Sequence, residues 1–328
     1  MTTLLDGVDA VLFDLDGVVY EGPTAVPHAI DAIRAIRQPV LYLTNNASRT
    51  DAQVAAHLEE LGLATTPEQV VTSPQAAMPL LAAHAQPGDA ILVVGGDGIT
   101  VELEARGYRV VRTAAEDPVA VVQGFAPHVG WKDLAEAAFA LHRGIPWIAT
   151  NMDWTIPQAR GIAPGNGTLV SAVHTAVGRM PQVAGKPETP IFTAALERVG
   201  ARSAIMVGDR LDTDIRGANR AGIPSVLVLT GIDRARSALT ATPEDRPTHV
   251  VDDLRELHAE YPQTRETFER STGATYAEVG RAAVRRLGGD VTLVRAGEGA
   301  DTLRAALHLV ATADRGPAAL RIDPALLA

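Results

Sequence analysis

Two aspartates one residue apart, Asp14 and Asp16, follow the first apolar run of the chain, Ala10 to Phe13, and Gly17 comes directly after them. The run predicts a buried strand, because it is apolar throughout and polar residues bound it. Side chains at i and i+2 of an extended segment point to the same side, so both carboxylates can face one ligand. Crowded carboxylates repel unless a cation lies among them. The pair therefore suggests a metal site in which one carboxylate attacks and the other moves a proton.

Polar residues also follow two later predicted strands, at residues 40–43 and 203–207. These residues are Thr44, Asn45 and Asn46 after the first, and Asp209, Asp212 and Asp214 after the second. Lys186, one of only two lysines in the chain, begins the loop GKPETP. Ligands bind at the carboxyl ends of strands in open parallel sheets, so we expect these groups to face one crevice. Oxygen ligands without His or Cys favour Mg²⁺.

The composition is that of a globular chain with a sizeable core. It has 328 residues, of which 46% are hydrophobic, and a net charge of −10. This charge argues against nucleic acid or an anionic membrane as a partner. There is no cysteine, which excludes disulfides and thiolate chemistry. The N-terminal stretch lacks the pattern of a signal peptide, and no run approaches the ~18 apolar residues of a membrane span, so we expect a cytoplasmic protein.

Strand-like and helix-like segments alternate, which predicts an α/β fold around a parallel sheet. A new series of alternating strands and helices begins at residues 90–94, and segments like those of the first series resume at residue 186. Residues 75–183 are therefore predicted to be an α/β insertion. The core domain would then comprise residues 1–74 and 184–262. A tail, residues 263–328, follows, with a strand expected at 291–295 and a helix at 301–311. About 65 residues form a marginal core alone, so the tail should pack on the body.

Four motifs match one family in order and spacing: DLDG, LTNN, GKP and VGDRLDTDI. They resemble the motifs of the haloacid-dehalogenase-like (HAD) phosphatases. The insertion, with ATNMD followed by PGNG, resembles the α/β (C2-type) cap of the nitrophenyl-phosphatase, phosphoglycolate and glycerol-3-phosphate phosphatase subfamily. The resemblance implies a Rossmann-like parallel-sheet core with an inserted α/β cap, to which this chain adds a small C-terminal βα appendage.

The resemblance also implies roles for the matching residues. Asp14 would be the nucleophile that forms an aspartyl-phosphate, and Asp16 would protonate the leaving alkoxide and then activate water. Mg²⁺ would be held by the Asp14 carboxylate, the Asp16 carbonyl and Asp209. The other residues would bind the phosphoryl oxygens (Thr44, Asn45, Asn46), neutralise their charge (Lys186), and orient that lysine and a metal-bound water (Asp214).

The expected function is Mg²⁺-dependent hydrolysis of small phosphomonoesters, with glycerol 3-phosphate or phosphoglycolate as the first substrates. Alternative substrates are a nucleoside monophosphate and pyridoxal phosphate. A phosphomutase is an alternative enzyme class, because it uses the same core. A ligand sensor without catalytic activity is the alternative to an enzyme. We expect a homodimer through the cap. In the tail, Gly297 and Gly299 after Arg295 faintly resemble the glycines of the pyrophosphate-binding turn of acetyltransferases. Their spacing from the arginine differs from that motif by one residue. We therefore expect a remnant lobe rather than a second activity.

Overall fold

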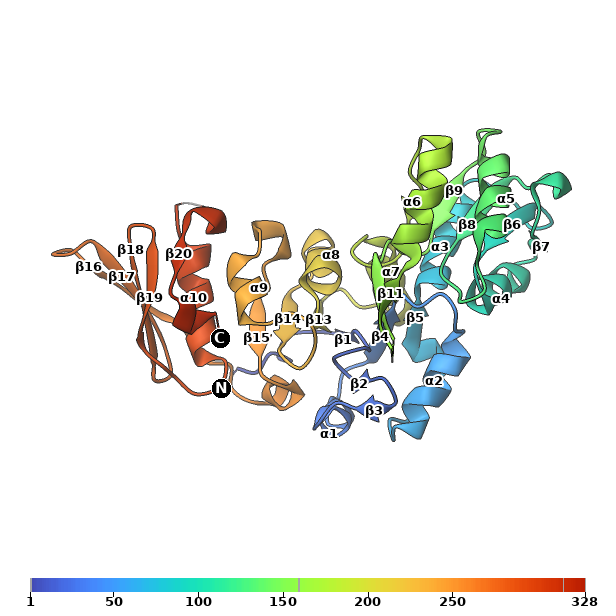
Figure 1. Cartoon of the computed structure of the whole chain (residues 1–328). Helices are drawn as coiled ribbons and strands as arrows, with labels where there is room; N and C mark the ends of the chain where they lie inside the picture. Colours follow the sequence, from blue (N-terminus) through green and yellow to red (C-terminus); the bar gives the residue numbers. More distant parts are fainter. Residues whose placement is uncertain (1, 159, 315, 328) are drawn as a thin grey trace. The chain divides into compact units, whose positions relative to one another are not determined.

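The computed structural model describes residues 2–158, 160–314 and 316–327 and is drawn in Figure 1. The chain forms two compact units. The first unit comprises Met1–Val40 and Ala201–Ala328, and the second comprises Leu41–Gly200. Each unit is described separately below. The division into core and cap at residues 75 and 183 stays a prediction.

The first unit contains a parallel sheet in which every neighbouring pair of strands runs in the same direction. The strand order is β15 (His249–Val251), β14 (Ser225–Val228), β13 (Ala204–Gly208) and β1 (Ala10–Phe13). All residues of β1, β13 and β14 are buried. Continuous apolar runs of this kind are typical of parallel strands that are covered on both faces. The predicted α/β class with a parallel sheet is confirmed.

Short helices connect these strands. They are α1 (Ala29–Arg34), α8 (Arg216–Arg220), α9 (Ala235–Thr240), η4 (Pro243–Asp245) and η5 (Leu254–His258). The segment that leads from β13 into α8 begins with a π-helix, η3 (Leu211–Ile215). Such wide turns are frequent at functional sites. A small hairpin of β2 (Tyr20–Glu21) and β3 (Thr24–Ala25) follows β1.

The tail forms a sheet of its own. Its antiparallel strands are β16 (Arg265–Glu269), β17 (Ala274–Val279), β18 (Ala282–Leu287) and β19 (Asp290–Arg295), and β20 (Arg321–Ile322) pairs with β19 in parallel. The helix α10 (Asp301–Ala311) lies against this sheet (Figure 1), and the short turns η6 (Pro317–Ala319) and η7 (Pro324–Leu326) follow it. The strand and helix predicted at 291–295 and 301–311 are confirmed, whereas the first three strands were missed.

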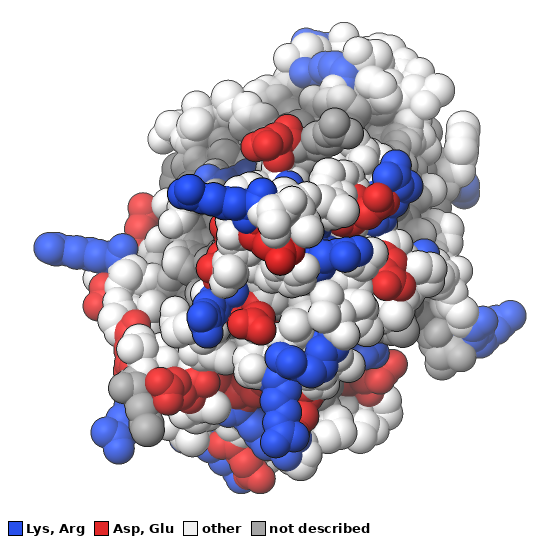
Figure 2. All heavy atoms as spheres, turned by 90° about the vertical axis from the view of Figure 1, so that its left-hand side faces the viewer, with Lys and Arg blue, Asp and Glu red and all other residues white. Residues whose placement is uncertain are grey.

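The tail shares a hydrophobic core with the outer strands of the first unit's parallel sheet. The buried side chains of Val284 and Leu309 in the tail belong to the same cluster as Ile215, Leu239 and Val250. The prediction that the tail packs on the body is therefore confirmed. Figure 2 shows the face over β16–β19, where basic and acidic side chains are interspersed rather than gathered by sign.

The second unit contains the parallel pair β4 (Val40–Thr44) and β5 (Val70–Thr72) and a separate parallel sheet in the order β12-β9-β8-β6-β7. The strands of that sheet are β6 (Ala90–Val94), β7 (Arg109–Val111), β8 (Ala120–Gln123), β9 (Trp147–Ala149) and β12 (Gln182–Val183). The antiparallel strands β10 (Thr155–Gln158) and β11 (Gly161–Pro164) form a hairpin.

Helices surround the strands of this second unit. They are α2 (Asp51–Glu60), α3 (Ser73–Ala82), α4 (Asp97–Ala105), α5 (Trp131–Leu141), α6 (Asn166–Val177) and α7 (Pro190–Val199), with the short turns η1 (Pro67–Gln69) and η2 (Ala114–Glu116). The alternation of strand and helix predicted for residues 75–183 is therefore present. Within the described parts of the chain, none of the helices has the length and hydropathy that a membrane span requires.

Candidate active site

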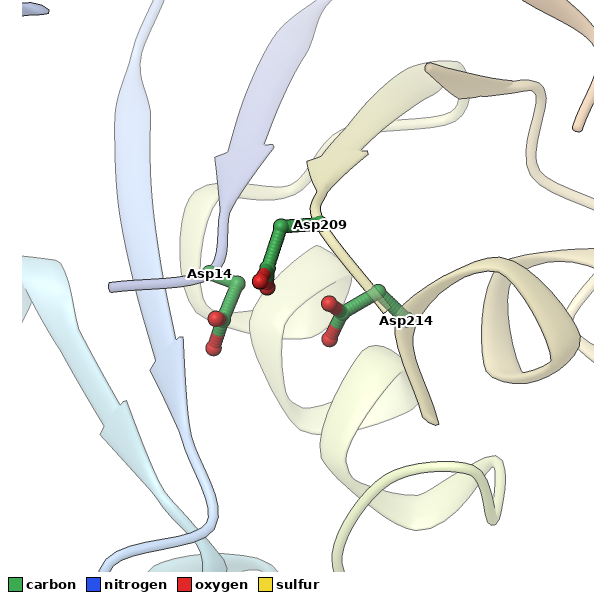
Figure 3. A group of neighbouring side chains, drawn as sticks. All are labelled: Asp14, Asp209 and Asp214. Atoms are coloured by element: carbon green, nitrogen blue, oxygen red, sulfur yellow. The ribbon is translucent and has the colours of Figure 1, made fainter. Parts of the chain in front are cut away.

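Three carboxylates meet beyond the ends of two neighbouring strands of the first unit. Asp14 follows β1, Asp209 follows β13, and Asp214 lies in η3. The Asp14 amide donates a hydrogen bond of 2.9 Å to the Val207 carbonyl, which continues the ladder between the two strands. One oxygen from each carboxylate lies within 4.8 Å of the other two (Figure 3). The sequence placed all three at strand ends, and the fold brings them together.

Backbone amides orient two of these carboxylates. The Ile232 amide donates a hydrogen bond of 2.8 Å to Asp209 Oδ2. The Arg210 amide donates one of 3.1 Å to Asp214 Oδ2 across the wide turn of η3. The side chains of Asp209 and Asp214 are buried, with exposures of 1% and 0%. Burial without water screening makes their mutual repulsion costly, so the cluster suits a bound cation.

The donors of this cluster fit a hard divalent cation. All three are carboxylates, and neither histidine nor cysteine belongs to the group. Magnesium and calcium prefer such oxygen ligands, whereas softer metals prefer nitrogen or sulfur. The residues present therefore fit the Mg²⁺ that the sequence suggested.

Three glycines allow the backbone to approach these carboxylates closely. A Cβ atom at Gly231 would lie 2.0 Å from Asp209 Oδ2, and one at Gly17 would lie 2.5 Å from the same oxygen. A Cβ atom at Gly208 would lie 2.2 Å from Asp214 Cβ. Real Cβ atoms do not approach so closely, so no larger residue fits without moving an aspartate. The glycines of the DLDG and VGD motifs thus have a steric role beside the acids.

Asp16 lies apart from the close carboxylate group. Its side chain is exposed, and its backbone forms a bridge with Tyr20. The Gly17 amide donates to the Tyr20 carbonyl at 2.8 Å, which closes the turn that follows β1. Its roles as proton donor and as carbonyl ligand stay predictions. Asp214 contributes a carboxylate oxygen to the group of three, and its expected role in orienting Lys186 and a metal-bound water stays a prediction.

The loop after β14 was missed by the sequence reasoning, although it completes this site. Thr230 Oγ1 donates a hydrogen bond of 2.7 Å to the Gly17 carbonyl. The Asp233 amide donates to the Asp209 carbonyl at 3.0 Å, and Asp233 Oδ2 accepts one of 2.7 Å from the Leu211 amide. A signal was present in the sequence, since LTGID follows β14 (Ser225–Val228) just as polar residues follow the other strands.

The other predicted residues lie in the second unit, where Asn45 connects them. Asn45 Nδ2 donates to Asp153 Oδ1 at 3.0 Å and to the Lys186 carbonyl at 2.9 Å. Asn45 Oδ1 accepts a hydrogen bond of 2.9 Å from the Lys186 amide. Asn151 Nδ2 donates to the Asn45 carbonyl at 2.7 Å. Asn45 therefore orients the backbone of Lys186, and Asn151 and Asp153 support that same segment.

Lys186 is buried, with an exposure of 3%, and its Nζ donates a hydrogen bond of 3.2 Å to the Leu43 carbonyl at the end of β4. Burying the charged ammonium group of a lysine is costly unless hydrogen bonds or an opposite charge compensate it. The buried position of Lys186 therefore agrees with a functional role. Thr44 Oγ1 accepts from the Asn46 amide at 3.1 Å. Asn46 Oδ1 accepts from the Ser48 amide at 2.9 Å, in a local turn. The structure thus brings Lys186, Asn45 and the end of β4 together.

Residues 11–109 match the haloacid dehalogenase-like hydrolase family, and residues 183–257 match the HAD-hydrolase-like family. The chain is 48% identical over 258 residues to the D-glycerol 3-phosphate phosphatase of Mycobacterium tuberculosis, covering 79% of this chain and 73% of that protein. This chain belongs to the haloacid dehalogenase-like hydrolase family.

Further relatives agree with this assignment. An acid sugar phosphatase of Staphylococcus aureus is 35% identical over 256 residues, which cover 76% of this chain and 97% of that protein. The crystal structure of a glycerol phosphate phosphatase from Mycobacterium tuberculosis in complex with magnesium has a TM-score of 0.86 and 42% identity, over 98% of this chain and 95% of that one. A 4-nitrophenylphosphatase from Thermotoga maritima has a TM-score of 0.71 and 29% identity, over 78% and 98% of the chains.

Proposed function

We propose that this chain is a Mg²⁺-dependent phosphatase of small phosphomonoesters, and that glycerol 3-phosphate is its preferred substrate. The observation that carries the proposal is the group of Asp14, Asp209 and Asp214 at the carboxyl ends of adjacent strands. The relatives named for glycerol 3-phosphate and sugar phosphates support the substrate class. The chain is an enzyme, a phosphoric monoester hydrolase of the HAD family.

In the proposed reaction an Asp14 carboxylate oxygen attacks the phosphorus atom. The ester P–O bond breaks, its electron pair leaves with the alkoxide, and the alkoxide takes a proton from Asp16. The product bound to the enzyme is an aspartyl-phosphate on Asp14. Asp16 then accepts a proton from water as the water oxygen attacks the phosphorus. The bond to Asp14 breaks, and inorganic phosphate leaves.

Charge neutralisation is the second requirement of phosphoryl transfer. Mg²⁺, when bound, neutralises the charge on the phosphoryl oxygens. Asp14 and Asp209 would hold it together with the Asp16 carbonyl, and the position of Asp214 adds a fourth candidate ligand. Lys186 supplies positive charge, and Thr44, Asn45 and Asn46 bind phosphoryl oxygens. Asn45 also positions the backbone of Lys186.

The direct test measures release of inorganic phosphate from glycerol 3-phosphate by the purified protein, with Mg²⁺ and with EDTA. Turnover with Mg²⁺ that EDTA abolishes is the expected result. Asp214→Asn should weaken activation by Mg²⁺, while Asp212→Asn, an exposed acid of the same turn, serves as the matched control. Phosphate release that is the same with EDTA would contradict the metal assignment, and no release from any phosphomonoester would favour the sensor hypothesis.

A panel of phosphomonoesters ranked by kcat/KM tests the substrate. Phosphoglycolate, a nucleoside monophosphate and pyridoxal phosphate are the alternatives that the motifs leave open. Glycerol 3-phosphate should rank first, and a higher kcat/KM for a nucleotide would overturn that choice. Transfer of the phosphoryl group to a sugar instead of water would identify a phosphomutase.

We also propose a cytoplasmic location and a homodimer formed through the cap. The helix α5 offers a surface for the dimer, because Trp131 and Phe139 on it are 78% and 58% exposed. Large exposed aromatic side chains are enriched at protein interfaces. Analytical ultracentrifugation tests the assembly. Sedimentation as a single species of 34.5 kDa would exclude the dimer.

A further inference from the structure

A cavity of about 210 Å³ lies in the first unit between β15 and the tail helix α10. Its walls come from the segment at residues 246–250, from Tyr261 and Thr264 in the connection to the tail, and from α10. Residues 246–249 precede and begin β15, so the cavity lies at the amino end of that strand. The carboxylate group lies at the carboxyl ends of the parallel strands, so the cavity is a separate site at the opposite edge of the sheet.

The lining of the cavity is basic. Arg246, His249, Arg304 and His308 all contribute to it, and no aspartate or glutamate does so among the described residues. The whole chain has a net charge of −10, and the nearby outer face carries both signs interspersed (Figure 2). Basic side chains that converge on a concave site in an acidic protein favour an anionic ligand.

Arg304 is already fully engaged and forms the fixed wall of the cavity. Its guanidinium donates to the Val250 carbonyl at 2.9 and 2.8 Å and to Asp301 Oδ1 at 2.9 Å, and it also pairs with Glu256. It stacks over the Tyr261 ring, 4.9 Å from the ring centroid. These contacts neutralise Arg304 and hold it in place, so it orders the site without needing a ligand.

Arg246 differs from Arg304 in having no such partners. Its Nε is buried with no hydrogen-bond acceptor, and its guanidinium takes part in no ion pair, within the residues that the structure describes. Burial lowers the pKa of this guanidinium below its usual value, and no carboxylate opposes that shift. An arginine nevertheless keeps its charge at neutral pH. A partly buried cation without a counter-ion is costly, and an anion in the cavity would remove that cost.

Neighbouring histidines could add hydrogen bonds to the same anion. The His249 ring meets the Tyr261 ring edge-on, at 4.8 Å between centroids, which holds the imidazole in position. Burial, and then the charge of Arg304, lower the pKa of His249, so the ring is neutral at pH 7. His308 Nε2 lies 2.8 Å from Glu266 Oε2 outside the cavity lining. A bound anion would favour the protonated His249 and raise its pKa.

We propose that this cavity is a second, non-catalytic site that binds a small oxyanion of the phosphate type, with Arg246 as its main ligand. The volume suits a phosphate group or a small phosphate monoester and is below the ~300 Å³ at which pockets for drug-sized ligands begin. Arginine is the residue best suited to this group, because its planar guanidinium donates two parallel hydrogen bonds to neighbouring phosphate oxygens.

The test follows histidine ring signals by NMR in the full-length protein with EDTA present, during titration with inorganic phosphate. Variants His249→Gln and His308→Gln assign the two signals, and His142 in the second unit serves as reference. The His249 signal should move saturably and its pKa should rise. Arg246→Gln should weaken this binding about tenfold or more, because a charge-assisted hydrogen bond is lost. Arg236→Gln, which alters an exposed arginine on α9, is the matched control and should bind like the wild type.

Several outcomes would overturn the site. One is a His249 signal in the wild type that does not move saturably, and another is equal affinity in Arg246→Gln. A third is an equal response to chloride at the same ionic strength, which would indicate screening alone. Methyl phosphate distinguishes the sources of the anion. Tighter binding of inorganic phosphate identifies the free ion as the ligand, and tighter binding of methyl phosphate identifies a monoester; either result supports a phosphate-type site.

Discussion

The group of Asp14, Asp209 and Asp214 and the cavity around Arg246 lie at opposite edges of one parallel sheet and have opposite charges. At the carboxyl edge, oxygens crowd within 4.8 Å and suit a cation. At the amino edge of β15, basic side chains line a cavity and suit an anion. The crowded carboxylates and the partly buried Arg246, which has no carboxylate partner among the described residues, each cost stability, as is common where a protein binds ligands.

The two edges differ in how their residues are supplied. Asp14 and Asp209 follow strands of the sheet directly, and Asp214 lies in the turn η3 after β13, so the sheet and this turn set the separation of the carboxylates. The cavity instead takes Arg304 from the tail helix and Arg246 from a loop, which are brought together by the core that the tail shares with β15. Changes at the carboxyl edge should therefore affect turnover, and changes at the tail should affect stability or binding.

The largest expected effect is that of Asp14→Asn on turnover. An amide does not form the aspartyl-phosphate, so kcat should fall by about 10⁴-fold or more, as for other catalytic nucleophiles. The melting temperature should stay the same or rise, because one crowded carboxylate is removed. Phosphate release and differential scanning calorimetry measure the two effects. Turnover near that of the wild type would show that Asp14 is not the nucleophile.

Asp16→Asn should have an effect that depends on the leaving group. Loss of a general acid costs about 10²- to 10⁴-fold when the leaving alkoxide is basic. Glycerol 3-phosphate should therefore suffer much more than p-nitrophenyl phosphate, whose phenolate leaves without a proton. Single-turnover measurements of phosphoryl transfer compare the two substrates. An equal loss for both would exclude Asp16 as the general acid in that step.

Gly231→Ala tests whether close backbone approach positions Asp209. The new methyl group would lie 2.0 Å from Asp209 Oδ2, so that the carboxylate must move. A misplacement of about 1 Å costs roughly 10²-fold in rate, and apparent Mg²⁺ affinity should fall with it. Gly130→Ala, where a Cβ would meet nothing within 4 Å, is the control. Unchanged Mg²⁺ activation in Gly231→Ala would show that this approach has no functional role.

Leu309→Ala tests whether the tail contributes to stability without contributing to catalysis. Leu309 is 0% exposed and packs in the core shared with Val250 and Leu239. Its truncation should cost about 2–5 kcal/mol of unfolding free energy, while kcat/KM of the folded enzyme stays unchanged. Leu287→Ala, at a position 40% exposed, should cost little. Urea denaturation and steady-state kinetics measure both quantities, and a large loss of kcat/KM would link the tail to the chemistry.

The smallest effect concerns pH. The pKa of His249 is lowered in the folded state by burial and by Arg304. The unfolded chain therefore binds more protons below about pH 6.5, and stability falls as the pH drops from 6.5 towards the folded pKa. His249→Gln should lose this part of the pH dependence of the unfolding free energy. The same slope between pH 7 and pH 5 in wild type and variant would show that His249 titrates alike in both states.

The strands that carry the acids could be predicted because parallel strands covered on both faces are apolar without interruption. The runs at residues 10–13 and 204–208 are examples, and the polar residue after each marks where the strand ends. The tail strand β16 escaped prediction because all five of its residues are exposed, so it has no apolar pattern to detect. The hairpin β10–β11 was missed for a similar reason, since Ile162 in it is 79% exposed.

The sequence by itself determined the α/β class, the acids and amides at strand ends, and the HAD family, because those features depend on neighbours along the chain. Only the tertiary structure decided that Asp214 joins Asp14 and Asp209, that Asn45 holds the backbone of Lys186, and that the loop at Thr230 completes the site. It alone also placed Arg246 and Arg304 around one cavity. The physical reason is that these contacts join residues far apart in the chain, and no local pattern records which distant side chains the packing of strands and helices brings together.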